Sequence, residues 1–185
     1  MPQRVCPWGL GYLLASPLRR LMLDPIKVLA PYVREGMTVL EPGPGMGFFT
    51  LELGRLVGPA GRVVAVDIQP RMLSRLKRRV ARAGLGERVD ARLAAPDTLG
   101  IADLAGSVDL TLAFYLVHEL PAVERFFGEV AKASKPGGGL LFAEPAGHVK
   151  KMDFETELKA AIHAGFELIE RPAIRRSDAA FLKKA

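Results

Sequence analysis

The sequence contains very little cysteine, and this shortage restricts the chemistry that the protein can carry. Its single cysteine, Cys6, cannot form a disulfide within the chain. It also has no second cysteine with which to build a thiolate metal site or a Cys-x-x-Cys redox pair. We therefore predict a protein of a reducing compartment with no bound metal.

Long hydrophobic runs are also missing from the sequence. The longest candidate, residues 110–117, is far shorter than the roughly 20 apolar residues that a membrane-spanning helix needs. The first residues faintly resemble a secretory leader, but Pro7, Gly9 and Gly11 interrupt the apolar stretch. We expect a soluble, cytoplasmic protein without a membrane span.

The composition is that of a chain that can bury a core. Hydrophobic residues make up 49% of the 185 positions and charged residues 25%, which predicts one ordered domain. Basic residues outnumber acidic ones by 26 to 20, a bias that suits nucleic acid, anionic lipid or an acidic substrate. Much of the excess falls on a predicted amphipathic helix at residues 70–83, and we favour its interpretation as a solvated helix face.

Apolar segments with the periodicity of strands alternate along the chain with segments that have the periodicity of helices. We predict strands at residues 37–40, 62–67, 89–94, 108–114 and 140–144, and helices at residues 48–57, 70–83 and 121–134. Strands that alternate with helices form a mostly parallel sheet covered on both faces. The fold class is therefore α/β.

The two ends of the sequence carry additional elements. Near the start, Ser16-Pro17 and Asp24-Pro25 each place an N-cap residue before a proline, which predicts two short helices within residues 17–33. We take residues 1–35 as a helical arm and residues 36–185 as the core of a single domain. Beyond the core strands we predict a helix at 154–163 and strands at 166–169 and 177–182. The last two strands are too close in sequence for a crossover helix, so they should pair antiparallel at the sheet edge.

The loop after the first predicted strand is rich in glycine, and it lies where open parallel sheets usually bind ligands. Gly43, Gly45 and Gly47 allow the backbone conformations and the close approach that a ligand requires. The spacing does not match the Gly-x-Gly-x-x-Gly fingerprint for NAD. Glu41 at the end of the first strand would repel a diphosphate and suits a cationic ligand. Asp67, at the end of the second strand and about 20 residues beyond the loop, can accept the hydroxyls of a ribose.

Four motifs follow one another in the sequence. They are Val39-Leu-Glu-Pro-Gly-Pro-Gly-Met-Gly47, Val64-Ala-Val-Asp67, Val108-Asp-Leu110 and Lys135-Pro-Gly-Gly138. In order and spacing they resemble the motifs of class I S-adenosylmethionine-dependent methyltransferases, over about residues 36–184. Within that superfamily the chain is most similar to a small-molecule branch that includes quinone-ring and arsenite methyltransferases. The resemblance implies a Rossmann-like sheet of seven strands with the last strand antiparallel, S-adenosylmethionine as cofactor and S-adenosylhomocysteine as product.

The resemblance also implies roles for particular residues. Glu41 would contact the ammonium end of the cofactor through the glycine loop, and Asp67 would hold the ribose. Ile68 would pack on the adenine, and Phe114 and Tyr115 would lie beside the methionine moiety.

The loop after the third strand departs from the family pattern. The branch usually has an aspartate there, near the adenine amino group, where this chain has Ala95 followed by Pro96 and Asp97. Either Asp97 or the backbone would make that hydrogen bond. An alternative role for Asp97, as the N-cap of the next turn, stays open.

Methyl transfer requires alignment of the acceptor with the methyl group, and a catalytic base is optional. The candidates for catalytic groups are His118, Tyr115 and Glu144, and His148 also follows the fifth strand. An unperturbed pKa of about 6.5 suits His118 to remove a proton. The alternative is a His118 that hydrogen-bonds locally at a helix start, with Glu119 as a first-turn acid. His163, inside the last predicted helix, is expected to be structural.

Trp8 and Tyr12 in the N-terminal arm are candidates for a lid that excludes water, or equally for core packing. A small organic acceptor is favoured because few residues lie outside the core, while the basic charge keeps RNA as an alternative. A non-catalytic protein that binds S-adenosylmethionine is the other alternative. The sequence gives no prediction of the oligomeric state.

Overall fold

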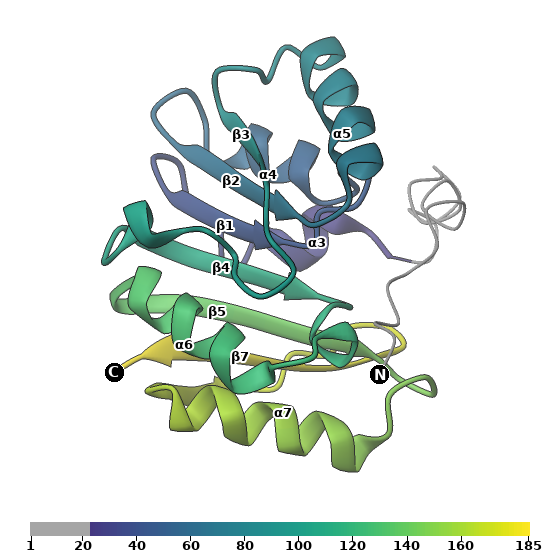
Figure 1. The fold of residues 1–185 in the computed structure, drawn as a ribbon, viewed down its shortest axis with the longest axis vertical. Coiled ribbons are helices and arrows are strands. Elements are labelled where there is room, and N and C mark those ends of the chain that lie inside the picture. The colour runs from purple at the N-terminus through teal and green to yellow at the C-terminus, as the bar shows by residue number, and fades with distance from the viewer. Residues whose placement is uncertain (1–22) are drawn as a thin grey trace. The chain divides into compact units, whose positions relative to one another are not determined.

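A computed structural model describes residues 23–185 of the chain (Figure 1). The chain divides into two compact units, whose described residues are 23–96 and 97–185. The predicted lid residues Trp8 and Tyr12 and the predicted helix that begins at Pro17 lie outside the described residues. The division into an arm of residues 1–35 and a core of residues 36–185 stays a prediction.

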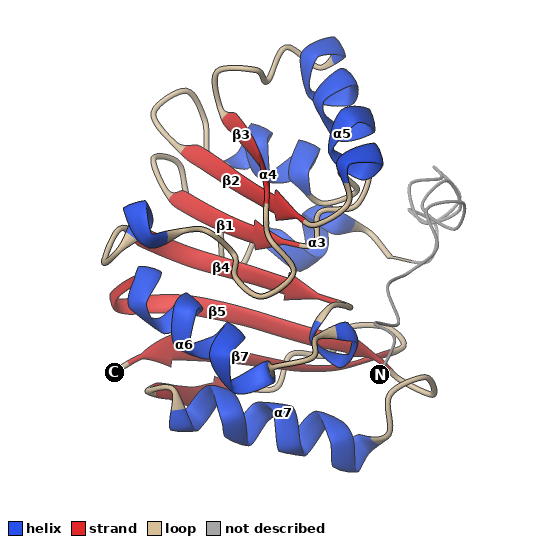
Figure 2. Ribbon diagram, viewed as in Figure 1, coloured by secondary structure: helices blue, strands red, loops and turns tan. Residues whose placement is uncertain are grey.

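Residues 23–96 of the first unit form three parallel strands and three helices (Figure 2). The elements are α3 (Pro25–Leu29), β1 (Thr38–Pro42), α4 (Thr50–Leu56), β2 (Arg62–Asp67), α5 (Pro70–Arg82) and β3 (Val89–Leu93). The strand order is β3-β2-β1, with β2 parallel to both neighbours. These elements confirm the predicted strand-loop-helix pattern, and their bounds agree with the predicted ones to within two residues.

Two helices of this unit show how the sequence sets their ends and faces. Helix α3 begins as predicted, because Asp24 accepts a hydrogen bond from the backbone N–H of Ile26 at 3.0 Å and Pro25 takes the first helical position. Helix α5 buries one apolar stripe against the sheet. The stripe consists of Met72, Leu73, Leu76 and Val80. Its basic residues fall outside that stripe, as the amphipathic pattern predicts.

The second unit contains four strands and two long helices. The elements are η1 (Ala102–Leu104), β4 (Val108–Phe114), η2 (Val117–Glu119), α6 (Val123–Ala133), β5 (Ser134–Pro145), α7 (Lys151–His163), β6 (Phe166–Glu170) and β7 (Ser177–Lys184), where η marks a short 3₁₀ helix. The strand order is β4-β5-β7-β6, with β4 and β5 parallel and β7 antiparallel to both of its neighbours. The predicted antiparallel pairing of the last two strands is therefore confirmed.

Strand β5 is longer than the sequence predicted. The segment Lys135–Gly139 was expected to be a turn between a helix and a strand at 140–144, but the strand already begins at Ser134. Ser134 pairs with Val108, and the next pair along is Gly139 with Leu110. Four residues of β5 therefore bulge out between two adjacent pairs. Gly137 allows this bulge because its φ is +73°.

Aromatic side chains form much of the core of the second unit. Phe127 of α6 packs edge to face on Phe142 of β5, with ring centroids 5.8 Å apart. Phe154 of α7 stacks on the same Phe142 at 4.9 Å. Both helices are thereby fixed on one face of β5. Among residues 23–185, no helix has both the length and the apolar character needed to cross a membrane.

Candidate functional site

The loop between β1 and α4 has the backbone that its glycines predict. Gly43, Gly45 and Gly47 all have positive φ, between 55° and 84°, a region that other residues rarely adopt. A Cβ atom on Gly47 would lie 2.5 Å from Cδ1 of Leu76, so a side chain at this position would have to displace Leu76 of α5. A Cβ atom on Gly45 would have no neighbour within 4 Å. The loop is therefore packed on one side and open at Gly45.

Glu41 is a buried carboxyl group at the end of β1. It is only 3% exposed, and its Oε2 atom has no hydrogen-bond partner among residues 23–185. Burial, against the opposite effect of the Thr50 hydroxyl and with a smaller contribution from the charge of Asp67, raises the pKa of Glu41 from 4.5 to about 7. A cation or a hydrogen-bond donor that reached this carboxyl group would favour its ionised form.

Asp67 ends β2 and holds the glycine loop. One carboxylate oxygen accepts a hydrogen bond from the backbone N–H of Gln69 at 2.8 Å, and the other accepts from the N–H of Gly45 at 3.3 Å. The next residue, Ile68, is 36% exposed, which is high for an isoleucine. The end of β2 therefore presents a fixed carboxylate followed by an accessible apolar side chain.

The residues after β3 are exposed. Ala95 lies in the first unit and carries no polar side chain. Asp97 belongs to the second unit, where its carboxylate lies 4.0 Å from Nη1 of Arg125 and its carbonyl accepts a hydrogen bond from the same atom. The binding roles of Ala95 and Asp97 stay predictions.

The end of β4 is held in an unusual conformation. Tyr115 has a φ of 60°, which is rare for a residue other than glycine. Its ring lies against that of Phe114, with centroids 4.5 Å apart, and its hydroxyl forms a 2.7 Å hydrogen bond with the hydroxyl of Ser177 at the start of β7. The tyrosine is thereby fixed at the carboxyl end of β4.

His118 and Glu144 form a hydrogen-bonded pair in the second unit. Nδ1 of His118, in η2, lies 2.5 Å from Oε2 of Glu144, which is completely buried at the end of β5. The other oxygen of Glu144 accepts a hydrogen bond from the backbone N–H of Val117 at 2.7 Å. The hydrogen bond to Glu144 raises the pKa of His118, with burial acting in the opposite direction. The arrangement fixes the ring and directs Nε2 away from Glu144.

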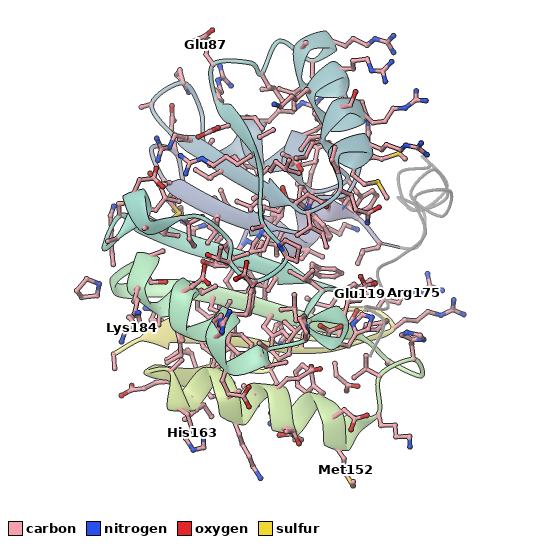
Figure 3. All side chains as sticks on the ribbon, in the orientation of Figure 1. Glu87, Glu119, Met152, His163, Arg175 and Lys184 are labelled. Carbon is pink, nitrogen blue, oxygen red and sulfur yellow. The ribbon has the colours of Figure 1, made fainter. Side chains whose placement is uncertain are left out.

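Three further titratable groups surround this pair. Glu119 places Oε1 4.0 Å from Nε2 of His118, and the ring of His148 lies edge to face on that of His118 at 5.3 Å. Glu157 of α7 is buried, and burial together with the charge of Glu144 raises the pKa of Glu157 to about 7. His163, by contrast, is exposed at the end of α7 (Figure 3), and its expected structural role stays a prediction.

Sequence reasoning missed Glu157. The residue lies among charged neighbours, and a glutamate is rarely buried. A signal was nevertheless present, because Phe154, Glu157, Leu158 and Ala161 share the spacing of one buried helix face. A carboxyl group at a core position is an unusual feature that this spacing identifies.

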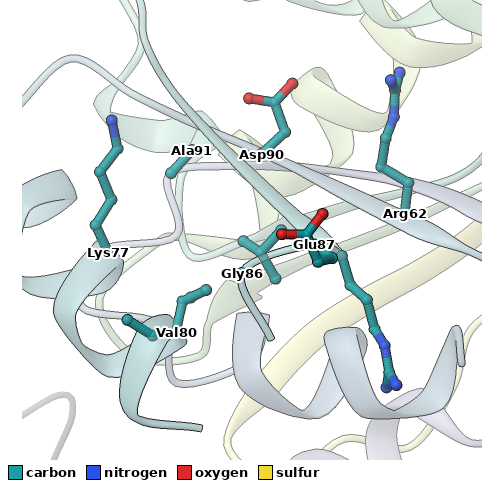
Figure 4. Close-up of a pocket in the computed structure, with 10 residues that line it drawn as sticks. Arg62, Lys77, Val80, Gly86, Glu87, Asp90 and Ala91 are labelled. Atoms are coloured by element: carbon teal, nitrogen blue, oxygen red, sulfur yellow. The ribbon is translucent and has the colours of Figure 1, made fainter. Parts of the chain in front are cut away.

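The first unit also has a groove of about 460 Å³ (Figure 4). Arg62 and Val89, the first residues of β2 and β3, line it together with Lys77, Glu87 and Asp90. The groove therefore lies at the amino ends of the strands, whereas ligands of open α/β sheets bind beyond the carboxyl ends. Its lining also mixes both signs of charge, so we do not assign it to the functional site.

Comparisons with known proteins identify the family of this chain. A family model described as a methyltransferase domain matches residues 33–180. An arsenite methyltransferase from Halobacterium salinarum is 33% identical over 109 residues, which is 59% of this chain and 27% of that protein. A ubiquinone/menaquinone biosynthesis C-methyltransferase from Hahella chejuensis is 30% identical over 112 residues, which is 60% of this chain and 44% of that protein. The chain thus matches less than half the length of these relatives.

A solved structure is similar over nearly the whole chain. A SAM-dependent methyltransferase from Aquifex aeolicus superimposes with a TM-score of 0.87 at 23% identity, and the match covers 98% of this chain and 100% of the other. At this identity the likeness shows the fold alone. The predicted α/β, Rossmann-like fold with seven strands and an antiparallel last strand is therefore confirmed.

Proposed function

The chain belongs to the family of S-adenosylmethionine-dependent methyltransferase domains, and from that premise we propose that it methylates a small organic acceptor with His118 as the general base. The family and the cofactor agree with the prediction from the four sequence motifs. The observation that carries the finer proposal is the His118–Glu144 pair, which is built as a base and its orienting carboxylate.

The residues of the first unit fit the cofactor that the family implies. The ligand carries a sulfonium and an ammonium group, and the orphaned Oε2 of buried Glu41 is an acceptor that a cationic ligand would satisfy. Asp67 is fixed at the end of β2, where a ribose would meet a carboxylate. Open space at Gly45 leaves room for close approach to the backbone. We propose these residues, with Ile68 against the adenine, as the cofactor-binding set.

The proposed mechanism is an in-line displacement. Bound S-adenosylmethionine supplies a methyl carbon on a positively charged sulfur. Glu41, Asp67 and Ile68 would hold this cofactor, and an acceptor aligned with its methyl carbon would take the methyl group and leave S-adenosylhomocysteine as the product. The acceptor's proton passes to Nε2 of His118. Glu144 keeps Nδ1 protonated and stabilises the imidazolium that results.

The relatives support a small acceptor, because their names describe an arsenite and a quinone-biosynthesis methyltransferase. RNA is the second candidate, since α5 carries six basic and no acidic side chains. We propose Tyr115 and Phe114 as walls of the site rather than as groups that exchange protons, because the hydroxyl of Tyr115 is already hydrogen-bonded to Ser177.

The test compares His118→Gln with His163→Gln, a control on the outer end of α7. Each protein is incubated with methyl-labelled S-adenosylmethionine in two separate reactions. One reaction contains a small-metabolite extract as the source of acceptor, and the other contains total RNA. We expect labelled small molecules, a loss of about 10²- to 10⁴-fold in rate for His118→Gln, and unchanged cofactor affinity by calorimetry. Label in RNA alone would favour RNA as the acceptor. Cofactor binding without methyl transfer would favour a non-catalytic protein. Equal rates for both variants would remove His118 from the mechanism.

A further inference from the structure

Helix α7 carries a buried carboxyl group that the proposed mechanism does not use. Glu157 is only 8% exposed, and its buried Oε2 atom has no hydrogen-bond partner in the part of the chain that the structure describes. Its neighbours on the same helix face, Phe154 and Leu158, are core residues. An ionised carboxylate in such surroundings is unstable unless another group compensates it.

Glu157 belongs to the layer that covers Glu144. Phe142 and Glu144 are two residues apart in β5, so their side chains lie on the same face of the strand. Phe154 of α7 stacks on Phe142 at 4.9 Å with the rings nearly parallel, at 15°. Helix α7 is therefore packed on that face of β5, and Glu157 lies one turn after Phe154. The carboxyl groups of Glu144 and Glu157 accordingly repel each other, and both interact with the charge of His118.

The charges of the cluster decide which group carries a proton. His118 and Glu144, hydrogen-bonded at 2.5 Å, are neutral together when the imidazole is protonated. An ionised Glu157 adds one uncompensated negative charge, and Glu119 near Nε2 and Asp153 on α7 add repulsion of the same sign. His148 contacts the ring of His118 through its edge. Two carboxyl groups close to one imidazole favour an additional bound proton. At neutral pH the cluster therefore holds one proton that free glutamates in solution would not hold.

We propose that Glu157 and His118 share a single proton, so that Glu157 is a positioning residue that determines whether the imidazole is free to act as a base. When the proton is on the Glu157 carboxyl group, His118 is neutral and Nε2 is able to accept a proton. When the proton is on His118, Glu157 is ionised and the base is blocked. The two states have the same total charge, so the cluster changes between them without a net uptake of protons.

The catalytic meaning of this inference rests on the proposed function of His118, whereas the sharing of the proton does not. The test therefore measures the proton directly, by NMR titration of the ¹³C-labelled histidine rings in the full chain. We expect His118 to titrate in two coupled steps in the parent protein. In Glu157→Gln it should titrate in one step, at a lower pH than the upper step of the parent, because a neighbouring negative charge is removed.

Glu155→Gln is the matched control. Glu155 lies on the same helix, but its side chain is 36% exposed and accepts a hydrogen bond from Arg171 at 2.7 Å. This variant should keep the two steps of the parent. An identical His118 titration in Glu157→Gln and the parent would overturn the proposal. The pH profile of the methyl-transfer rate should lose one ionisation in Glu157→Gln and none in Glu155→Gln.

A reciprocal measurement keeps the test decisive if Glu157→Gln fails to fold. The side-chain carboxyl carbon of Glu157 is titrated in the parent and in His118→Gln. Because the charge of His118 lowers the pKa of Glu157, that pKa should rise in the variant. An unchanged pKa would overturn the shared proton. If His118→Gln keeps its methyl-transfer rate while the coupled titrations are observed, the general-base role fails and the shared proton stands.

Discussion

At the scale of single residues, Asp67 is the strongest candidate for a contact with the cofactor. Its carboxylate is fixed by the backbone N–H groups of Gln69 and Gly45. Asp67→Asn should weaken binding of S-adenosylmethionine by about 1 to 3 kcal/mol, because an amide replaces a charged acceptor. Titration calorimetry measures the change. Asp90→Asn, at a part-buried ion pair with Arg92, is the control and should bind as the parent does.

The Tyr115–Ser177 hydrogen bond is the basis of a second prediction for single residues. Tyr115→Phe and Ser177→Ala should each lower the free energy of unfolding by about 1 kcal/mol, because each removes one side of the same bond. The double variant should lose little more than either single one, and urea unfolding of all four proteins gives the coupling. Fully additive losses would show that the two hydroxyls do not stabilise each other.

The sequence predicted individual site residues better than it predicted their contacts. Glu41, Asp67, His118 and Glu144 all lie at or just after the ends of strands, as expected. The contact between His118 and Glu144 was not predicted, because it joins two elements 26 positions apart and depends on how β4 and β5 pair. Glu157 was missed because charge, which suggests exposure, outweighed its position on the buried face of α7.

At the scale of elements, periodicity and end signals predicted the regular segments. Strands β2 and β4 have the bounds that the sequence predicted, because β-branched residues and turn residues limit both. Strand β5 was predicted too short, since a Lys-Pro-Gly-Gly-Gly run indicates a turn when pairing is unknown. The register with β4 shows instead that the run forms a bulge within the strand.

The glycine loop connects two elements, β1 and α4, and its glycines should differ in their tolerance of a side chain. Gly47→Ala forces a Cβ into Leu76 of α5 at a φ of +84°, whereas Gly45→Ala meets open space at +55°. Both variants lose conformational freedom that glycine provides. Gly47→Ala should lose about 1 to 3 kcal/mol more in the free energy of unfolding because of the clash.

Urea unfolding of the two alanine variants against the parent measures this difference. Gly45→Ala also reports on the ligand, because its new methyl group would occupy the open space above the loop. We expect it to weaken S-adenosylmethionine binding more than it weakens the fold. Equal stability of the two variants would contradict the packing role of Gly47.

At the scale of the whole molecule, the fold followed from the sequence as a whole. The alternation of strands and helices predicted the parallel strands of the sheet. The short connection between β6 and β7 predicted their antiparallel pairing. The identity of the acceptor did not follow, because it depends on which side chains line the site. Those side chains come from separate segments, and no motif in the sequence describes them together.

The pH dependence of stability is a property of the whole molecule to which the buried groups contribute with the same sign. Burial raises the pKa of Glu41 and Glu157 from 4.5 to about 7. Between these two pH values the folded chain therefore binds more protons than the unfolded chain, and stability falls as pH rises. His118 acts in the same direction, because its raised pKa stabilises the fold below pH 6.5 and the contribution is lost as pH rises through the folded value.

We therefore expect the free energy of unfolding, measured in urea without cofactor, to decrease from pH 5 to pH 8. Glu41 alone should account for about 3 kcal/mol of the decrease, since each pKa unit corresponds to about 1.4 kcal/mol. Glu41→Gln should have a flatter profile and should exceed the parent in stability at pH 8, because it removes a carboxylate that is buried without compensation. A parent protein whose stability rises over this range would show that these carboxyl groups are ionised in the folded state without the penalty that their burial requires.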